Sequence, residues 1–260
     1  MNNIEEQYKK STNLRTRISI HERFSTNKED WHRWLFDRYN LPDERLRILE
    51  IGCGDATFWV KNRERVSERW SITLSDFSRG MVEAAKTNVS RLANIHVEQM
   101  KIENIPYEEN LFDVVIANHM LYHVPDRNKA LSEVRRVLKD GGTFFSSTIG
   151  EEHMRGFGDL LKGFSPQLDY PSATVHAKEF GLENGADQLR CFFDNVDLIN
   201  FPGDLSITDE HAIIDYLHST NVHRFGEEEV GGFLKYLQEV KEANGGAIPI
   251  TKSTGLFVSQ

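Results

Sequence analysis

The stretch that decides the fold is LRILEIGCGDATFWV, residues 46–60. Its first six residues are rich in leucine and isoleucine and predict a buried β-strand, which ends in Gly52 and Gly54. A helical pattern begins at about Thr57. A glycine-containing turn between a strand and a helix is a common place for nucleotide-bearing ligands, because helix N-termini bind such groups. The stretch therefore predicts a nucleotide-type site at the end of a buried strand.

Strand and helix patterns alternate after this stretch. Apolar strands are expected over residues 71–75, 95–99, 112–118 and 141–149, and amphipathic helices from residue 57 and over residues 79–92 and 126–140. Such alternation is typical of a parallel sheet covered by helices on both faces, with right-handed crossovers. Gly141 and Gly142, after Leu138, are expected to end the last of these helices and turn the chain.

The two ends of the chain are patterned differently. Near the N-terminus a helix is expected from Thr26, which has capping-box spacing to Glu29, with Trp31, Trp34 and Leu35 on one face. Residues 151–190 show no strand pattern and predict an insertion of helices and loops. Strands over residues 195–201 and 254–260 and helices near Thr208 and over residues 227–243 follow. The expected domains are a helical cap (1–45), a core (46–150), an insertion or lid (151–190) and the C-terminal part of the core sheet (191–260).

Composition narrows the class of partner. The 260 residues carry a formal charge of −9, and their 31 basic residues are scattered among 40 acidic ones. Nucleic acid is therefore an unsuitable substrate, because phosphate contacts need a concentrated basic surface. The two cysteines, far apart in sequence, favour neither a disulfide framework nor a zinc site. No apolar run has the length of a signal-peptide core or a membrane span, so a soluble, cytoplasmic protein is expected. It is expected to be a monomer or a homodimer.

Two acidic residues indicate which ligand the glycine loop holds. The third glycine of a dinucleotide-binding loop is replaced by Thr57, and Glu50 beside the loop would repel a pyrophosphate. A carboxylate attracts a cation instead, by about 4 kcal/mol at ~4 Å and an effective dielectric of about 20, before desolvation. Asp76, at the end of the second strand, suits the two hydroxyls of a ribose. S-adenosylmethionine combines a ribose, a sulfonium and an ammonium group, and it is the predicted ligand.

Residues 46–149 resemble the class I S-adenosylmethionine-dependent methyltransferases, in order and with the family's spacing. LEIGCGDA resembles the first motif, with Ala56 in place of the last glycine; LSDFSRGMVEAAK, NLFDVVIANHMLYHVPD and LSEVRRVLKDGGTFF resemble the segments that follow. The resemblance implies a Rossmann-like, seven-stranded, mostly parallel sheet with helices on both faces and the last strand antiparallel. An N-terminal helical lid and an inserted segment of helices and loops would be added to it.

The resemblance also implies a set of cofactor-binding residues. Asp76 would hold the ribose, Phe77 would flank the adenine and Met81 would pack on it. The backbone at Asn118 and His119 would face the methionine end. Lys101 stands where the family often has an acid, so adenine recognition would rest on the backbone of Lys101 and Ile102 or on Glu103. The implied set is Glu50, Gly52, Cys53, Gly54, Asp76, Phe77, Met81, Lys101, Ile102, Asn118 and His119.

Candidate catalytic residues follow the fourth strand. His119, Tyr122 and His123 are expected to line the methyl-transfer pocket, either as walls or with one histidine as general base, since a neutral imidazole suits proton removal near pH 7. The alternative is that His123 packs under the next helix. Histidines four residues apart suit a metal on a helix, but no third ligand has matching spacing, so no metal is expected.

Candidate substrate and lid residues lie outside the core. The segment RISIHERFSTNKEDWHRWLF resembles the leader of small bacterial methyltransferases of mostly unassigned substrate, which implies that Arg17, His21 and Phe24 lie over the cofactor. Trp31 is a further lid candidate, although Trp31 and Trp34 would more simply be buried staples of a lid helix. Phe157, Phe164 and Tyr170 are candidates for the acceptor pocket, with internal packing as the alternative.

The expected activity is methyl transfer from S-adenosylmethionine to O, N, S or C of a small molecule, with S-adenosylhomocysteine as product. The loop ANHMLYH lacks the Asn-Pro-Pro-aromatic sequence of methyltransferases that act on DNA bases or protein amides, which favours a small acceptor. Alignment of the acceptor can supply much of the acceleration. Two alternatives stay open: a non-enzymatic protein that binds the cofactor or a partner on the same fold, and an NAD-dependent oxidoreductase, which Thr57 and Glu50 disfavour.

Overall fold

The computed structural model describes residues 11–168, 174–220 and 225–260, which divide into two compact units. The larger unit comprises Glu29–Gly150, His176–Phe201 and Thr254–Gln260. The smaller unit comprises Met1–Lys28, Glu151–Val175 and Pro202–Ser253. Among the described residues, no helix has the length and apolar character needed to cross a membrane. Each unit is assembled from three separate segments of the chain. The four consecutive domains expected from the sequence stay a prediction.

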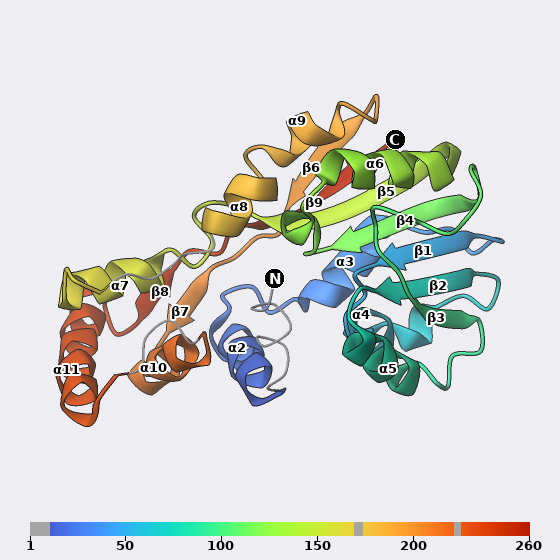
Figure 1. The fold of residues 1–260 in the computed structure, drawn as a ribbon. Helices are drawn as coiled ribbons and strands as arrows, with labels where there is room; N and C mark the ends of the chain where they lie inside the picture. Colours follow the sequence, from blue (N-terminus) through green and yellow to red (C-terminus); the bar gives the residue numbers. More distant parts are fainter. Residues whose placement is uncertain (1–10, 169–173, 221–224) are drawn as a thin grey trace. The chain divides into compact units, whose positions relative to one another are not determined.

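A seven-stranded sheet forms the centre of the larger unit (Figure 1). Its order is β3 (Ile95–Gln99), β2 (Ser71–Asp76), β1 (Arg47–Ile51), β4 (Phe112–Asn118), β5 (Leu138–Ile149), β9 (Thr254–Ser259) and β6 (Val196–Asn200). The pairs among the first five strands are parallel, and β9 runs antiparallel to both of its neighbours. The predicted sheet, mostly parallel with its last strand antiparallel, is confirmed.

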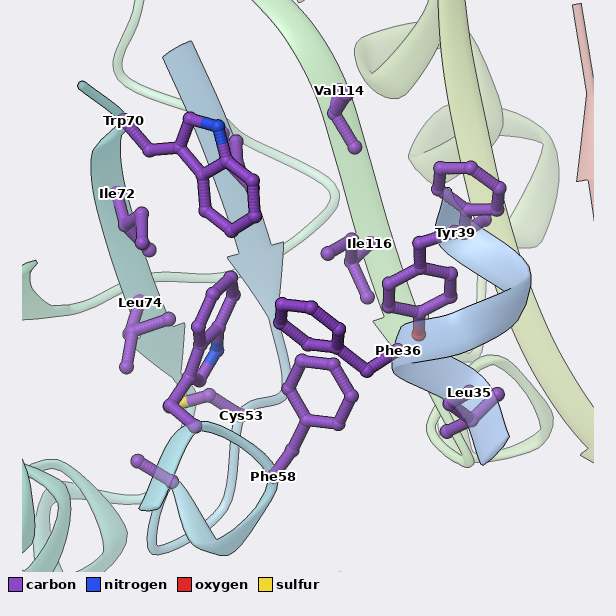
Figure 2. Close-up of a cluster of buried hydrophobic side chains, with 14 of the residues drawn as sticks. Leu35, Phe36, Tyr39, Cys53, Phe58, Trp70, Ile72, Leu74, Val114 and Ile116 are labelled. Carbon is purple, nitrogen blue, oxygen red and sulfur yellow. The ribbon is translucent and has the colours of Figure 1, made fainter. Parts of the chain in front are cut away.

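Helices cover both faces of this sheet, because alternate residues of each buried strand point to opposite sides. Helices α3 (Trp31–Tyr39), α4 (Thr57–Lys61) and α5 (Arg79–Asn88) pack on the face that contains Ile48. Figure 2 shows part of this core, with Phe36 and Phe58 beside Ile116. Helices α6 (Arg127–Val137) and α9 (Gly185–Leu189) and the end of α8 (Thr174–Phe180) pack on the face that contains Leu49. Glu50 shares the face of Ile48.

The start of α3 differs from the prediction. Asp30 is the capping residue, and its Oδ1 accepts hydrogen bonds from the backbone N–H groups of His32 (2.9 Å) and Arg33 (3.2 Å). Thr26 belongs to the smaller unit, where its hydroxyl donates to the carbonyl of Asp204. The capping box from Thr26 was therefore wrong, because the nearer carboxylate of Asp30 satisfies the free N–H groups of the second and third residues of the helix.

The glycine pair after Leu138 also differs from the prediction. Helix α6 ends at Val137 and β5 begins at once, so Gly141 and Gly142 lie inside the strand. The register between β4 and β5 shifts here, and Gly141 has a φ of +74°. The pair therefore shapes an irregularity in the sheet and does not end the helix, as is common for glycine at a bulge.

The smaller unit has its own core. It contains α2 (Ser11–Phe24), α7 (Gly156–Phe164), α10 (Glu210–Ser219), α11 (Glu227–Ala243) and an antiparallel pair, β7 (Leu205–Ile207) with β8 (Ile248–Ile250). Phe157, Ile213 and Phe233 are among the fully buried residues of its apolar cluster. The sequence pattern located α10 and α11, but not α2, β7 or β8.

Candidate cofactor and catalytic site

The glycine loop bends sharply away from the end of β1. The N–H groups of Gly52 and Cys53 both donate to the carbonyl of Ser75, at 2.8 and 2.9 Å, which holds the loop against β2. Gly52 has a φ of +76°, and a Cβ there would lie 2.8 Å from Cγ of Met120. Gly54 has a φ of +57° and nothing within 4 Å of the same position. Gly52 is thus required by close packing, whereas Gly54 leaves open space beside the backbone.

Asp76 lies directly against this loop. Its Oδ2 accepts a hydrogen bond from the N–H of Gly54 (3.0 Å) and its Oδ1 accepts one from the N–H of Ser78 (2.8 Å). Partial burial raises the pKa of the carboxyl, although both hydrogen bonds oppose the rise. The structure therefore brings together Gly54 and Asp76, two residues predicted to hold opposite ends of a nucleoside-bearing ligand.

Glu50 is a buried carboxylate, with 2% of its surface exposed. Nε1 of Trp59 donates to its Oε2 at 2.5 Å, and Nδ2 of Asn118 donates to its Oε1 at 3.1 Å. Burial raises the pKa of Glu50 to about 7, although the two hydrogen bonds lower it. A carboxyl group with a pKa of about 7 is only partly ionised at neutral pH, and a nearby cation would favour its charged form.

Asn118 connects Glu50 to two further elements. Its Oδ1 accepts hydrogen bonds from the hydroxyls of Tyr39, on α3, and Ser147, on β5, both at 2.9 Å. Burial raises the pKa of Tyr39 far above its ordinary value, so the phenol stays a neutral donor. Sequence reasoning missed Tyr39, Trp59 and Ser147, because no spacing along the chain links residues from different elements to one carboxylate.

The predicted adenine-binding residues follow β2 and β3. Phe77 is 57% exposed, which is unusual for a large apolar side chain. Its ring lies 4.9 Å from Nζ of Lys101. Met81 is half-buried, whereas Ile102 is buried in the core. Phe77 thus offers an aromatic face to a ligand, and Ile102 has only its backbone to offer.

Cys53, between the two glycines, is buried. Burial raises the pKa of its thiol, and the neighbouring carboxylates add to the rise. Its Sγ lies 3.5 Å from the carbonyl of Gly54. A thiol whose pKa is raised is a weak nucleophile, so Cys53 can take part in a site only by its shape and its backbone.

Three aromatic side chains gather just beyond β4. Tyr122 and His123 lie in a single 3₁₀ turn (Leu121–His123), and their rings contact His176 of α8. The ring-centroid distances are 4.5 Å from Tyr122 to His123, 5.0 Å from Tyr122 to His176 and 4.9 Å from His123 to His176. Burial and the neighbouring His176 lower the pKa of His123 to about 4, so its imidazole is neutral at pH 7. The sequence did not single out His176, which lies more than fifty residues beyond Tyr122.

His119 is separate from this trio of rings. It has a φ of +49°, its N–H donates to the carbonyl of Ser147 at 3.0 Å, and its ring lies 5.3 Å from that of Trp31. Trp31 in turn stacks on Trp34 at 5.3 Å. Among the described residues, no three His, Cys, Asp or Glu side chains form a group that could hold a metal ion. His119 and His123, which were expected to line one pocket, thus occupy different surroundings.

The remaining lid candidates belong to the smaller unit. Phe24 and Phe157 are buried in its apolar core, and His21 and Arg17 are partly buried. The ring of Phe164 packs 5.1 Å from that of Phe233. Tyr170 lies outside the described residues. Internal packing, the alternative reading of Phe157 and Phe164, agrees with these contacts, and a role in acceptor binding stays a prediction.

Comparisons with known proteins give the same class of protein as the resemblance in the sequence. A family model described as "Methyltransferase domain" matches residues 49–146. The chain is 30% identical over 196 residues to the ubiquinone/menaquinone biosynthesis C-methyltransferase UbiE of Haemophilus ducreyi, covering 74% of this chain and 73% of the relative. It is 31% identical over 140 residues to the demethylmenaquinone methyltransferase of Staphylococcus epidermidis, and this match spans 54% of either protein. The chain thus spans about half the length of the staphylococcal relative.

Solved structures give the same fold. The phosphoethanolamine N-methyltransferase 2 of Haemonchus contortus, in complex with S-adenosyl-L-methionine, superposes with a TM-score of 0.57. The superposition covers 95% of this chain and 56% of that protein, at 15% sequence identity. At this identity the likeness concerns the fold alone.

Proposed function

Because this chain belongs to the class I S-adenosylmethionine-dependent methyltransferases, we propose that it transfers a methyl group from S-adenosylmethionine to O, N, S or C of a small-molecule acceptor. The observation that carries the proposal is the meeting of three features at the ends of β1 and β2. A glycine loop lies beside the carboxylate of Asp76, with the buried carboxylate of Glu50 at its base. The buried carboxylate of Glu50 at the base of the loop would repel a pyrophosphate and attract a cation.

The residues present fit this cofactor. Each oxygen of Asp76 accepts one backbone N–H, and a carboxylate has about four acceptor positions, so it can also accept hydrogen bonds from two ribose hydroxyls. The open space beside Gly54 lets a ligand approach the backbone closely. The exposed ring of Phe77 supplies an apolar surface for the adenine, with Met81 and the backbone of Lys101 and Ile102 next to it.

The methionine end of the cofactor is assigned to the loop residues and to the end of β4. Gly52 and Cys53 offer backbone groups there, as do Asn118 and His119. Glu50, with a pKa of about 7, gains its charge fully when a cation binds, and Trp59 and Asn118 hold that charge in place. Bound S-adenosylmethionine supplies a methyl group on a positively charged sulfur, and S-adenosylhomocysteine leaves as the neutral product.

The chain's own part in the chemistry is alignment, exclusion of water and, for a protonated acceptor, removal of a proton. His123 is the proposed base, because its ring is held by Tyr122 and His176 and its imidazole is neutral at pH 7. Its pKa of about 4 makes it a weak base, so its contribution would be smaller than that of an imidazole with a pKa near 7. His119, whose ring contacts Trp31, is the second candidate. Orientation of the acceptor can supply much of the acceleration without any base.

A transfer assay tests this proposal. The purified protein is incubated with S-adenosylmethionine labelled in its methyl group and with a panel of small acceptors: phenols, hydroquinones, amines, thiols and carboxylic acids. Hydroquinones are included because the two relatives above are named as menaquinone-pathway methyltransferases. Label is expected in one acceptor class, together with equimolar S-adenosylhomocysteine. Tight cofactor binding without transfer to any class would instead support the non-enzymatic alternative.

A further inference from the structure

A cluster of basic and hydroxyl side chains lies inside the smaller unit. His21 comes from α2, His153 from the segment before α7, and Lys252 from the segment after β8. The rings of His21 and His153 are nearly parallel, with centroids 6.5 Å apart. Nζ of Lys252 donates to Oγ of Ser25 at 2.7 Å. Four groups that carry hydrogen-bond donors thus converge from three parts of the chain, since Ser25 directly follows α2.

Backbone contacts fix these residues in place. The N–H of Ser25 donates to the carbonyl of His21 (3.1 Å), and the N–H of Ser253 donates to Nδ1 of His153 (3.2 Å). The N–H of Lys252 donates to Oδ1 of Asp204 at 2.9 Å. Because Nδ1 of His153 accepts a hydrogen bond, the neutral ring carries its proton on Nε2 and donates from there. The cluster is therefore positioned by the fold and does not depend on flexible side chains alone.

The electrostatics of the cluster disfavour positive charge. Burial, together with the nearby Lys252, lowers the pKa of His21 to about 4. Burial also lowers the pKa of Lys252, although Asp204 opposes the change. Ser25 is buried, and His21, His153 and Lys252 are each partly buried. Burial thus disfavours the charged forms of His21 and Lys252, and a bound anion would stabilise those charged forms.

We propose that His21, His153, Lys252 and Ser25 bind an oxyanion, a carboxylate or phosphate group of a small molecule. An ammonium, two imidazoles and a hydroxyl are donors suited to such oxygens, and charge-assisted hydrogen bonds of this kind are the stronger class. The site lies wholly within the smaller unit. The proposal goes beyond the methyl transfer and does not depend on it.

The test follows the histidine side-chain signals of the full-length protein by NMR. Sodium phosphate and sodium acetate are titrated separately at pH 7, with ionic strength held constant by sodium chloride. The signals of His21 and His153 are expected to shift saturably at millimolar anion, and the pKa of His21 is expected to rise. The exposed His211, on α10 of the same unit, is the internal control and should not saturate. A response to only one of the two salts identifies the anion as phosphate or carboxylate.

Two variants make the test specific. Lys252→Met keeps the aliphatic part of the side chain but removes the ammonium, and it should weaken anion binding at least fivefold. Lys252→Arg keeps a cation and should retain most of the affinity. Lys235→Met, at an exposed position on α11, is the matched control and should leave binding unchanged. Absence of saturable shifts in the wild-type protein overturns the proposal, as do shifts that Lys252→Met leaves unaltered. If Lys252→Met fails to fold, the shifts of His21 and His153 are compared between wild type and Lys252→Arg, with His211 as the internal control. Saturable shifts in both proteins support the proposal, and their absence overturns it.

Discussion

Glu50 shows how one buried residue can link stability to ligand binding. Its carboxylate is held by two neutral donors, Trp59 and Asn118, and these hydrogen bonds do not offset the loss of hydration. An apolar residue at this buried position of a β-strand would have no such loss of hydration. Glu50 therefore costs stability in the free protein, and we expect the attraction of a cationic ligand to offset this cost.

The raised pKa of Glu50 predicts a pH dependence of stability. Because the pKa in the folded state, about 7, lies above the ordinary value of 4.5, folding favours the protonated form. The stabilisation is complete below pH 4.5 and is lost as the pH rises towards 7, by roughly 3 kcal/mol if the shift is fully expressed. Urea unfolding of wild type and Glu50→Gln between pH 4.5 and 8 measures it. The stability of wild type relative to Glu50→Gln should fall over this range, and a constant difference would contradict the assignment.

His123 and His176 give a second prediction at this scale. The depressed pKa of His123 arises from burial and from its neighbour. Replacing His176 with glutamine should therefore raise the pKa of His123 towards 6.5, as followed by NMR titration of its ring. His96, on the edge strand β3, serves as the control signal and should not respond to the replacement. No movement of the His123 titration would show that the two rings do not interact.

At the scale of elements, the connection from β1 to α4 is the most constrained part of the larger unit. Gly52, Gly54 and Ala56 all have positive φ values, so three left-handed residues lie within five positions. Met120, from the loop after β4, packs on Gly52. The shape of the loop thus depends on a side chain from a neighbouring loop. For this reason a Cβ atom at Gly52 would clash, whereas one at Gly54 would not, although both glycines have positive φ values.

Alanine substitutions at the two glycines separate these effects. Gly52→Ala adds strain at positive φ and a clash with Met120, and it should cost about 2–4 kcal/mol of stability. Gly54→Ala adds only the backbone strain, which is about 1 kcal/mol. Urea unfolding at pH 7 compares the two variants. Equal losses at both positions would mean that the contact with Met120 has no part in holding the loop.

The same scale shows which elements a sequence pattern can locate. The bounds of β3, β4 and α11 agree with the predicted segments, because their periodicity is strong and local. The cap of α3 was placed four residues early, at Thr26, since a spacing of three between Thr26 and Glu29 does not reveal that Asp30 caps the helix. The three-residue strands β7 and β8 were missed, because each gains its stability from a partner more than forty residues away.

At the scale of the whole molecule, the predicted sheet was confirmed but the assembly of units was not foreseeable. The smaller unit joins segments from three parts of the chain, and no local pattern shows which of them share a core. The same reason limits prediction of the site. Asp76 and Glu50 stand in motifs close to the glycine loop and could be predicted from the sequence. His176 and Tyr39 contact His123 and Asn118, which are far from them in sequence, so folding alone brings them together. The segments expected to recognise the acceptor, residues 1–45 and 151–190, lack the strand and helix alternation of the core, and the sequence therefore indicates the cofactor better than the acceptor.

The most direct measurement is isothermal titration calorimetry of wild type and Asp76→Ala with S-adenosylmethionine, S-adenosylhomocysteine and NADH. Wild type should bind the first two at micromolar concentration and should not bind NADH. Loss of the charged hydrogen bonds should weaken both affinities in Asp76→Ala by about 1–3 kcal/mol, or roughly 5- to 150-fold. Asp140→Ala, whose native side chain is 93% exposed, is the matched control and should bind as wild type does. Unchanged affinity in Asp76→Ala, or binding of NADH in place of S-adenosylmethionine, would contradict the proposed cofactor site.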